Sequence, residues 1–578
     1  MALSNPHAAT VRYEPDEHPP HGLALALALQ LMMLELGEII LIPVVVVRAA
    51  GGADTYLAWA AFAALAISGI TTMLQARRVG RIGSGYILLM VTSGAFIAVC
   101  VTALTEGGPG LLMTLLIASS LFQFLLAWRL SLLRRIITPT VAGTVLMLIA
   151  VTIMPVVAEL LEEVPEGASE GGIYLCAAAT LLVTLVMMLR GSSAVRRWAP
   201  ISGVVLGCVV ASFFGLYEVD RVAEAAWFGL PQGGWPGFDF TLGPAFWALL
   251  PAFVFVTLVG AIETVGDVVG IQKVSWRKPR ATDFRSVQGA VAADGVGNLL
   301  SGLAGTVPNT TCASGVATVE VTGVASRRVG IYIGLFFLAL TLLPKALALF
   351  LAIPGPVAAS YLLVMIAILF SLGMRIVVQD GMDFRKAAIV GVAFWIGTGF
   401  QHNIFFPGGL EGWAGELLGN GMAAGGLAAL VMTAFLELTS PRRTRIETEL
   451  NTGALRKIDE VLGRMSSKRG WGEEMVRRLR LVAEETIETL SSREVEGADG
   501  DKPRRLRLVI RPGRAGAEME FVASLGEGNL EDRLALIGER PAEGPVEHEI
   551  SLRLLRHFAS SVRHQQYLDT DIVTVKIA

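Results

Sequence analysis

Two acidic side chains, Glu263 and Asp267, stand four residues apart inside the apolar stretch AIETVGDVVG at 261–270. Residues at this spacing lie on one face of a helix, so the two carboxylates would stack there. Two carboxylates that close cannot both ionise cheaply in a low-dielectric environment, which predicts a proton carrier working near neutral pH. A carboxylate also accepts hydrogen bonds from the ring N–H groups of a heterocycle. The alternative is a structural pair bonded to nearby backbone.

A second acidic pair, Glu35 and Glu38, lies three residues apart in LQLMMLELGEIILIP at 29–43. An ionised side chain at the centre of a bilayer costs about 2.5 kcal/mol or more, so acids that persist there are functional candidates. If both face a cavity, they would bind cations, protons or a substrate. The simpler alternative is that one of them reaches toward the interface or makes a polar contact between helices.

Small and hydroxyl residues dominate a third segment, GTVPNTTCASGVATVEVTG at 305–323, where Thr311, Ser314 and Gly315 are candidates for lining a substrate site. Such residues could instead simply permit close helix packing. The segment GSGYILLMVTSGAF at 83–96 is interrupted in a similar way. Freed backbone groups in a bilayer survive only where they line a protein cavity. Two broken helices, one in each half, indicate a transporter built from repeated halves.

The elements that carry these residues are predicted to span a membrane. The chain is 53% hydrophobic and 17% charged, whereas soluble domains carry about 25% charged residues. Apolar runs near the length of about 20 residues that a spanning helix needs recur along it. We expect an all-α polytopic protein of about fourteen spans near 23–47, 56–75, 84–103, 110–130, 138–161, 172–190, 199–217, 246–272, 287–304, 311–324, 329–350, 356–374, 387–402 and 420–438.

The distribution of basic residues predicts the orientation. One set of loops is basic, and the alternating set is nearly free of Lys and Arg. By the positive-inside rule the basic loops are cytoplasmic, which puts both termini in the cytoplasm and agrees with an even number of spans. We expect a multi-pass protein of a bacterial inner (plasma) membrane. The net charge of −3 indicates no nucleic-acid partner, and the four cysteines show no metal or redox spacing.

The composition divides the chain into three parts: a polar cytoplasmic leader at 1–22, a membrane domain at 23–438 and a soluble cytoplasmic domain at 439–578. The last part is rich in Arg and Glu and has ordinary soluble patterning, which predicts a small α+β domain. Its expected elements are helices at 473–490 and 549–562 and strands at 504–511, 517–523 and 571–577.

The membrane part resembles the nucleobase–ascorbate transporters, also called xanthine/uracil permeases. The residues that carry the resemblance are AIETVGD in the eighth span, DGVGNLLSGLAGTVPNTT at 294–311, VTGVASRRVG at 321–330 and IPGPV at 353–357. The resemblance implies two inverted seven-span repeats, with a core domain that holds the substrate and a gate domain that dimerises. It also implies a purine, pyrimidine or ascorbate substrate, driven by protons or sodium and with no other cofactor.

The resemblance further implies roles for single residues. Glu263 matches the glutamate that binds the base, and Asp267 matches the second acid of that motif. Phe96, with Ser93, Gly94 and Ala95, matches a short strand of the third span whose backbone and aromatic ring meet the base. The sequence departs from the pattern in two places. The usual Gln-His of the first span is Gln30-Leu31, and the usual Glu or Gln followed by Asn in the tenth span is Ser314-Gly315.

The soluble part faintly resembles the histidine-kinase-like ATPase fold of anti-sigma factors, in LRLVAEETIETL at 479–490, SLGEGN at 524–529 and SLRLLRHFASSV at 551–562. Its nucleotide-binding Asn position holds Glu488 or Thr489, and the Asp of the D-x-G-x-G box is Ser524. These changes predict a domain that has lost nucleotide chemistry and serves regulation or protein contacts. An α+β domain of other ancestry is the alternative.

The leading hypothesis is a homodimeric secondary transporter of a nucleobase. Coupling protons would be carried by Asp267, Glu263 and Glu35 or Glu38. The first alternative is an anion carrier of the sulfate/bicarbonate type, which shares the inverted-repeat fold. The second is a membrane sensor that signals through its C-terminal domain to a protein partner. The sequence shows no nucleophile–base constellation, metal cluster or phosphate loop, so we do not expect an enzyme.

Overall fold

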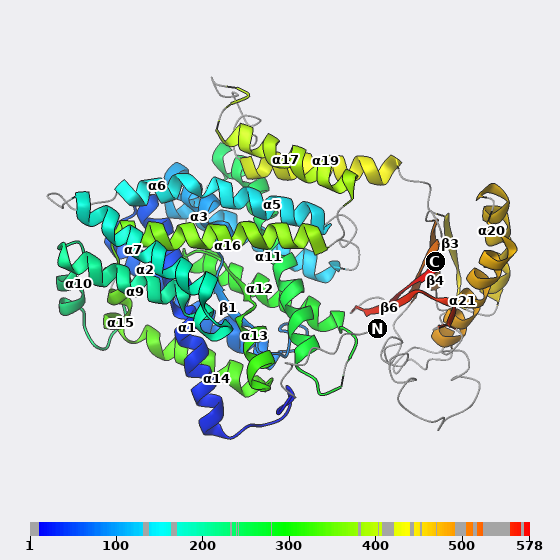
Figure 1. Ribbon diagram of the computed structural model, residues 1–578, viewed down its shortest axis with the longest axis horizontal. Coiled ribbons are helices and arrows are strands. Elements are labelled where there is room, and N and C mark those ends of the chain that lie inside the picture. The colour runs from blue at the N-terminus through cyan, green and yellow to red at the C-terminus, as the bar shows by residue number, and fades with distance from the viewer. Residues whose placement is uncertain are drawn as a thin grey trace. The chain divides into compact units, whose positions relative to one another are not determined.

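The computed structural model divides into two compact units (Figure 1). One comprises Met1–Ser275 with Gly289–Leu436, and the other comprises Trp276–Gln288 with Glu437–Ala578. The structure describes residues 11–130, 138–162, 170–231, 234–237, 240, 242–278, 280–379, 383–402, 404–406, 421–439, 444–450, 453–469, 471–491, 505–512, 517–523, 555, 557–567 and 571–577.

The first unit is built almost wholly of apolar helices. In the part of the chain that the structure describes, seven helices are long and apolar enough to cross a membrane. The helices of this unit are α1 (His21–Ala49), α2 (Asp54–Arg77), α3 (Ile97–Trp128), α5 (Pro139–Thr152), α6 (Met154–Glu162), α7 (Glu170–Arg190), α8 (Ser193–Arg197), α9 (Ala199–Phe213), α10 (Val219–Glu224), α11 (Pro244–Val274), α12 (Phe284–Ala304, which begins in the other unit), α13 (Ser314–Thr322), α14 (Arg327–Thr341), α15 (Pro344–Leu351), α16 (Gly355–Gln379), α17 (Phe384–Gln401) and α19 (Gly421–Thr439).

Two helical stretches are bent where the sequence carries glycine or proline. Helix α3 bends at Gly108, whose φ of 67° is left-handed and suits a residue without a Cβ. Pro109 follows and has no N–H to continue the helical hydrogen bonds. Helices α14 and α15 meet at an angle of 84°, and Pro344 begins the second of them. The predicted span at 329–350 is therefore a bent pair.

The interrupted segments of the two halves contain short strands, which corrects the expectation of broken helices there. Strand β1 (Leu89–Thr92) pairs antiparallel with β2 (Asn309–Cys312). The 3₁₀ helix η1 (Gly94–Phe96) and α3 follow β1, and α13 follows β2. The pairing satisfies backbone groups that would otherwise be unpaired inside a bilayer. Strand β1 is also fixed to α1, because Thr92 Oγ1 donates to the Ile39 carbonyl at 2.9 Å.

The second unit contains an antiparallel five-stranded sheet in the order β3–β4–β5–β7–β6. Its strands are β3 (Thr444–Glu449), β4 (Arg505–Pro512), β5 (Ala517–Ala523), β6 (Ser561–Gln566) and β7 (Asp571–Ile577), and its helices are α20 (Gly453–Arg469) and α21 (Glu473–Ser491). Helix α21 buries Leu479, Val482 and Ile487 on one face, as its 3.6-residue periodicity predicts. Each such buried aliphatic side chain contributes about 1.5–3 kcal/mol.

The architecture predicted from the sequence is confirmed: a polytopic helical membrane part and a small α+β C-terminal part. The helix at 473–490 and the strands at 504–511, 517–523 and 571–577 are present. Half of the helix expected at 549–562 lies outside the described residues. Leu555, His557 and Phe558 are helical as predicted, but the chain from Ser561 onward belongs to strand β6. The count of about fourteen spans stays a prediction.

Candidate functional site

A network of hydroxyl, amide and carboxyl groups joins α11, α12 and β2. The Thr264 hydroxyl of α11 donates to Asp294 of α12, and Gln75 Nε2 of α2 lies 3.4 Å from the same carboxylate. Thr311 of β2 donates to Asp267 Oδ2 at 2.8 Å, and its Oγ1 is 3.2 Å from that of Thr264. Asp294 is completely buried. Two acids of the site are therefore held by short polar side chains on neighbouring elements.

Asp294 is a residue that the sequence reasoning did not single out. The sequence could have indicated it, because Asp294 is the one acidic residue in the apolar run at 287–304. The same run supplies Asn298, whose Oδ1 accepts from the Asn309 N–H at 3.1 Å and whose Nδ2 donates to Gln123 at 2.6 Å. Asn298 thereby fixes the first residue of β2 to α12.

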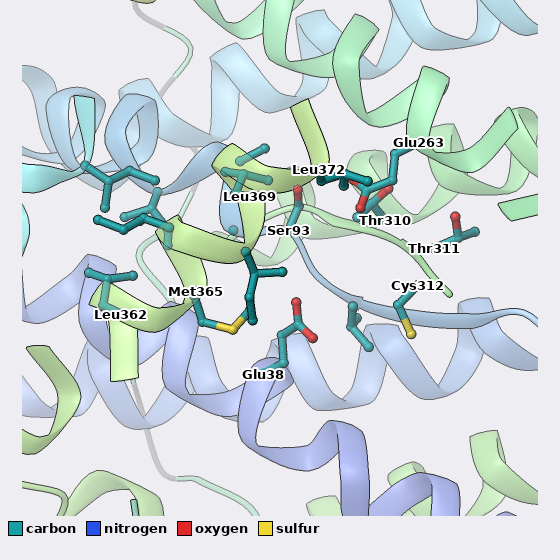
Figure 2. A pocket seen from close by; sticks show the side chains of 17 residues that line it. Glu38, Ser93, Glu263, Thr310, Thr311, Cys312, Leu362, Met365, Leu369 and Leu372 are labelled. Atoms are coloured by element: carbon teal, nitrogen blue, oxygen red, sulfur yellow. The ribbon is translucent and has the colours of Figure 1, made fainter. Parts of the chain in front are cut away.

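A pocket of about 100 Å³ lies between α1, the β1–η1 segment, α11, β2 and α16 (Figure 2). Its polar lining consists of carboxyl, hydroxyl and thiol groups, those of Glu38, Ser93, Glu263, Thr310, Thr311 and Cys312. Helix α16 supplies an apolar wall that includes Leu362, Met365, Leu369 and Leu372. No Lys, Arg or His is among the lining residues that the structure describes.

Two carboxylates enter this pocket from different helices. Glu38 points into it from α1, and Glu263 enters from α11 on the other side, with Ser93 between them (Figure 2). Neither carboxylate has a hydrogen bond or an ion pair with any described residue. The hydroxyl of Thr310 also lines the pocket, is buried, and has no hydrogen-bond partner among the described atoms. The pocket thus presents acceptors that no described protein group satisfies.

The other acid of α1 is placed differently. Glu35 is buried and accepts a hydrogen bond from the Cys312 thiol at 3.6 Å. Ser314 also hydrogen-bonds to Glu35, and its hydroxyl lies 2.8 Å from the Cys312 sulfur. Glu35 lines a larger cavity of about 640 Å³, bounded by α1, α9, α15 and α16. That cavity shares Glu38, Met365 and Ile368 with the smaller pocket, so Glu38 stands where the two meet.

The remaining residues singled out in the sequence fall into two groups. Gly94, Ala95 and Thr311 line the pocket with Glu38 and Glu263. Phe96 and Gly315 lie outside its lining. The ring of Phe96 is buried and packs against Phe253, with centroids 6.2 Å apart.

Gly315 is a packing position. A Cβ at this residue would lie 2.4 Å from the Ile87 carbonyl oxygen, so the close approach of α13 to the segment before β1 requires glycine. Ser314, its neighbour, acts on Glu35 and Cys312 rather than on the pocket.

The described residues include no group of three or more His, Cys, Asp or Glu side chains that could hold a metal ion. The acids of the site are arranged in pairs or with hydroxyl partners instead. Such an arrangement can accept hydrogen bonds from a ligand and can take up and release protons.

Comparison with known proteins decides the family. The sequence profile of xanthine/uracil permeases, described as a permease family, matches residues 22–404. The chain belongs to this family. It is therefore a multi-pass membrane permease and not an enzyme, and the resemblance drawn from its motifs is confirmed.

Individual relatives agree with this assignment. The chain is 27% identical to the xanthine permease XanP of Escherichia coli over 398 residues, which cover 63% of this chain and 81% of XanP. It is also 27% identical to the uric acid permease PucK of Bacillus subtilis over 437 residues, covering 73% of this chain and 99% of PucK. Among solved structures, the murine anion transporter Slc26a9 in its inward-facing state aligns with a TM-score of 0.51 at 12% identity, covering 76% of this chain and 72% of that one. At that identity the likeness shows the fold alone.

Proposed function

We propose that this permease is a secondary active transporter of a nucleobase of the xanthine or urate type, working by alternating access as a proton symporter. The observation that carries the proposal is the pocket between the two halves of the chain, lined by Glu263, Glu38 and hydroxyl groups. Two relatives support a purine substrate, because XanP is named a xanthine permease and PucK a uric acid permease.

Recognition of the base would rest on hydrogen bonds to its edges. An ionised Glu263 accepts from ring N–H groups, and such charge-assisted bonds contribute about 1.5–3 kcal/mol each. Gly94 and Ala95 begin η1, where the first N–H groups of a helix have no acceptor within the helix. Those amides could donate to a carbonyl oxygen of the base. The ring would then lie against Ala95 and the apolar wall of α16.

Coupling to protons would rest on the acids around the pocket. The Thr311 and Thr264 hydroxyls donate to Asp267 and Asp294, and their oxygens lie 3.2 Å apart, so rotation of one hydroxyl would complete a hydrogen-bonded route between α11 and α12. Glu263 and Glu38 face the same small space. Several carboxylates this close in a low-dielectric site cannot all be ionised, so the site would take up protons when it closes on a neutral substrate. Sodium is the alternative coupling ion.

The size of the pocket supports the proposal of alternating access. Its volume of about 100 Å³ is below the range of about 300–1,000 Å³ common for ligand sites. A base would fit once Met365 and Leu369 of α16 move away from β1 and β2. The cavity of about 640 Å³ beyond Glu38 would supply the route in. Rocking of the β1–β2 core against a gate that contains α16 and dimerises would perform this movement.

The anion-carrier alternative has less support. Slc26a9 shares the fold, but the described lining of the pocket holds carboxylates and no basic side chain. Fixed negative charge repels an anion. We also propose that the protein lies in a bacterial inner membrane with both termini in the cytoplasm, a proposal supported by the distribution of basic residues among its loops.

Uptake by proteoliposomes that contain the full chain tests this function. Xanthine, urate, hypoxanthine, guanine and uracil would be offered, with sulfate and bicarbonate as controls. An imposed inward proton gradient is expected to drive accumulation of at least one base, and a protonophore is expected to abolish it. Accumulation of sulfate or bicarbonate without any base would overturn the proposal. A base that accumulates with a sodium gradient and not with a proton gradient would correct the coupling ion only.

A further inference from the structure

The pocket holds one feature that nucleobase binding through a single glutamate does not explain, namely a second free carboxylate. Glu38 and Glu263 both line it and come from separate helices, α1 and α11. The two side chains enter from opposite sides, with Ser93 between them (Figure 2). Neither has a hydrogen-bond or ion-pair partner among the described residues.

The other three acids of the region are all engaged. Glu35 is held by Cys312 and Ser314, Asp267 by Thr311, and Asp294 by Thr264 and Gln75. The contrast is not a matter of burial alone, because Asp267 is half-buried like Glu38 and Glu263 and still has a hydrogen-bond partner. Glu38 and Glu263 are therefore set apart as the acceptors that are available to a ligand.

A third unsatisfied group supports this assignment. The Thr310 hydroxyl lies in the same lining, and Thr310 is only 6% exposed. It has no hydrogen-bond partner among the described atoms. Leaving a buried polar group unpaired is unfavourable, so such groups in a pocket indicate a ligand that pairs with them. The described lining has no basic side chain and its side-chain donors are hydroxyl and thiol groups, so N–H donors to the two carboxylates would come from a ligand.

We propose, on the basis of the nucleobase function above, that the pocket selects a heterocycle carrying N–H donors on two opposite edges. Glu263 accepts from one edge and Glu38 from the other. Glu38 is then a specificity-determining residue of this site. An ionised carboxylate only accepts hydrogen bonds, so a carbonyl edge turned toward Glu38 would place two acceptors against each other. A purine with one N–H on its six-membered ring and one on its imidazole ring meets the requirement.

Xanthine and its monomethyl derivatives provide the test, because each methyl group removes a single N–H donor. Equilibrium binding of xanthine and of its N1-, N3-, N7- and N9-methyl forms would be measured on the purified full chain. The variants are Glu38→Ala, Glu263→Ala and the control Glu35→Gln, which changes an acid that already has protein partners. Glu38→Gln keeps the side-chain volume and serves if the alanine variant fails to fold.

In the wild type, methylation on each of two opposite edges is expected to weaken binding about tenfold or more, as the loss of a hydrogen bond to a charged group implies. In Glu38→Ala, one of these penalties is expected to fall below about threefold while the other persists. In Glu263→Ala, the other methylation penalty is expected to fall below about threefold, while the one lost in Glu38→Ala persists. Glu35→Gln is expected to keep both penalties. In Glu38→Gln, methylation on the edge that faces Glu38 is expected to weaken binding less than it does in the wild type, but still to weaken it.

The outcomes separate this inference from the function on which it rests. If the wild type binds xanthine but Glu38→Ala retains every methylation penalty, Glu38 does not read the ligand and the inference is overturned. A loss of affinity in Glu38→Ala that is equal for all five ligands would also overturn it, because that pattern belongs to proton coupling. If no purine binds the wild type, the proposed function fails and the inference fails with it.

Discussion

The acids on α1 and those on α11 and α12 make an instructive comparison. On α1, Glu35 is bound by a thiol and a hydroxyl, whereas Glu38 has no hydrogen-bond partner among the described residues and faces the pocket. On the other side, Asp267 and Asp294 are bound by threonines, whereas Glu263 likewise has no described partner and faces the same pocket. Each side thus combines bonded acids with one open acid. Hydrogen bonding to protein groups, rather than burial or spacing, therefore distinguishes the acids that position the site from the acids that can bind a ligand.

The largest effect is expected at an open acid. Glu263→Gln should lower the initial rate of xanthine uptake by about a hundredfold or more, since a neutral amide loses the charge-assisted bond and the protonatable group together. Uptake by proteoliposomes measures it. Glu320→Gln is the matched control, because Glu320 is exposed on α13 and lines neither cavity. Equal rates in Glu263→Gln and wild type would remove the distinction between open and bonded acids.

A bonded acid is disturbed through its partner. Thr311→Val removes the donor to Asp267 and should lower uptake about tenfold, because a hydrogen bond to a charged group contributes about 1.5–3 kcal/mol. Thermal unfolding of the variant should occur at a lower temperature. Thr310→Val is the control for unfolding, since the Thr310 hydroxyl has no hydrogen-bond partner among the described atoms. If both variants unfold alike, the bond between Thr311 and Asp267 contributes nothing to stability.

The bonded acid of α1 can be disturbed without touching either open acid. Gly315→Ala places a Cβ 2.4 Å from the Ile87 carbonyl oxygen and should displace the start of α13, where Ser314 holds Glu35. Overpacking of this kind destabilises by about 1–3 kcal/mol, so thermal unfolding should shift downward. Gly266→Ala in α11, where a Cβ meets nothing within 4 Å, should leave the unfolding temperature unchanged or raised. If Gly315→Ala leaves the unfolding temperature unchanged, α13 can shift without loss of stability.

The smallest effect is expected at an exposed acid of the second unit. Arg445 and then Arg507 lower the pKa of Glu447, whose side chain is 60% exposed. A lowered pKa means that the pair favours folding above the ordinary pKa of Glu, about 4.3, and that this contribution disappears as pH falls through the lowered value. Because Glu447 is exposed and solvent screens the pair, Glu447→Gln should leave unfolding of the full chain at pH 7 almost unchanged. A downward shift at pH 7 comparable to that of Gly315→Ala would show that exposed ion pairs matter more here than solvent screening allows.

The sequence predicted much of this site because acids are rare in apolar runs. Glu263 and Asp267 were found by their four-residue spacing, and Glu35 and Glu38 by their place in the first span. Spacing could not show that one member of each pair is bonded and the other open, since the partners Thr311, Cys312 and Ser314 come from distant segments. Asp294 carried the same signal as the other acids and was overlooked.

Other features left no readable pattern. Strands β1 and β2 have four residues each, which is too short for alternation to distinguish them from interrupted helices. The apolar wall of α16, with Met365 and Leu369, has the composition of any lipid-facing helix. Packing alone makes it a wall of the pocket. The predicted strands of the second unit were correct because they are longer and bounded by turn residues.

Direct binding by the purified full chain tests the central claim, which is that the two open carboxylates form a nucleobase site. Thermal shift would be recorded with xanthine, urate, hypoxanthine, guanine and uracil, and with sulfate and bicarbonate, for wild type and Glu263→Gln. A ligand that binds the folded state raises its unfolding temperature. We expect that at least one base stabilises the wild type, that Glu263→Gln loses this shift, and that neither anion produces one. Stabilisation by an anion and by no base would contradict it.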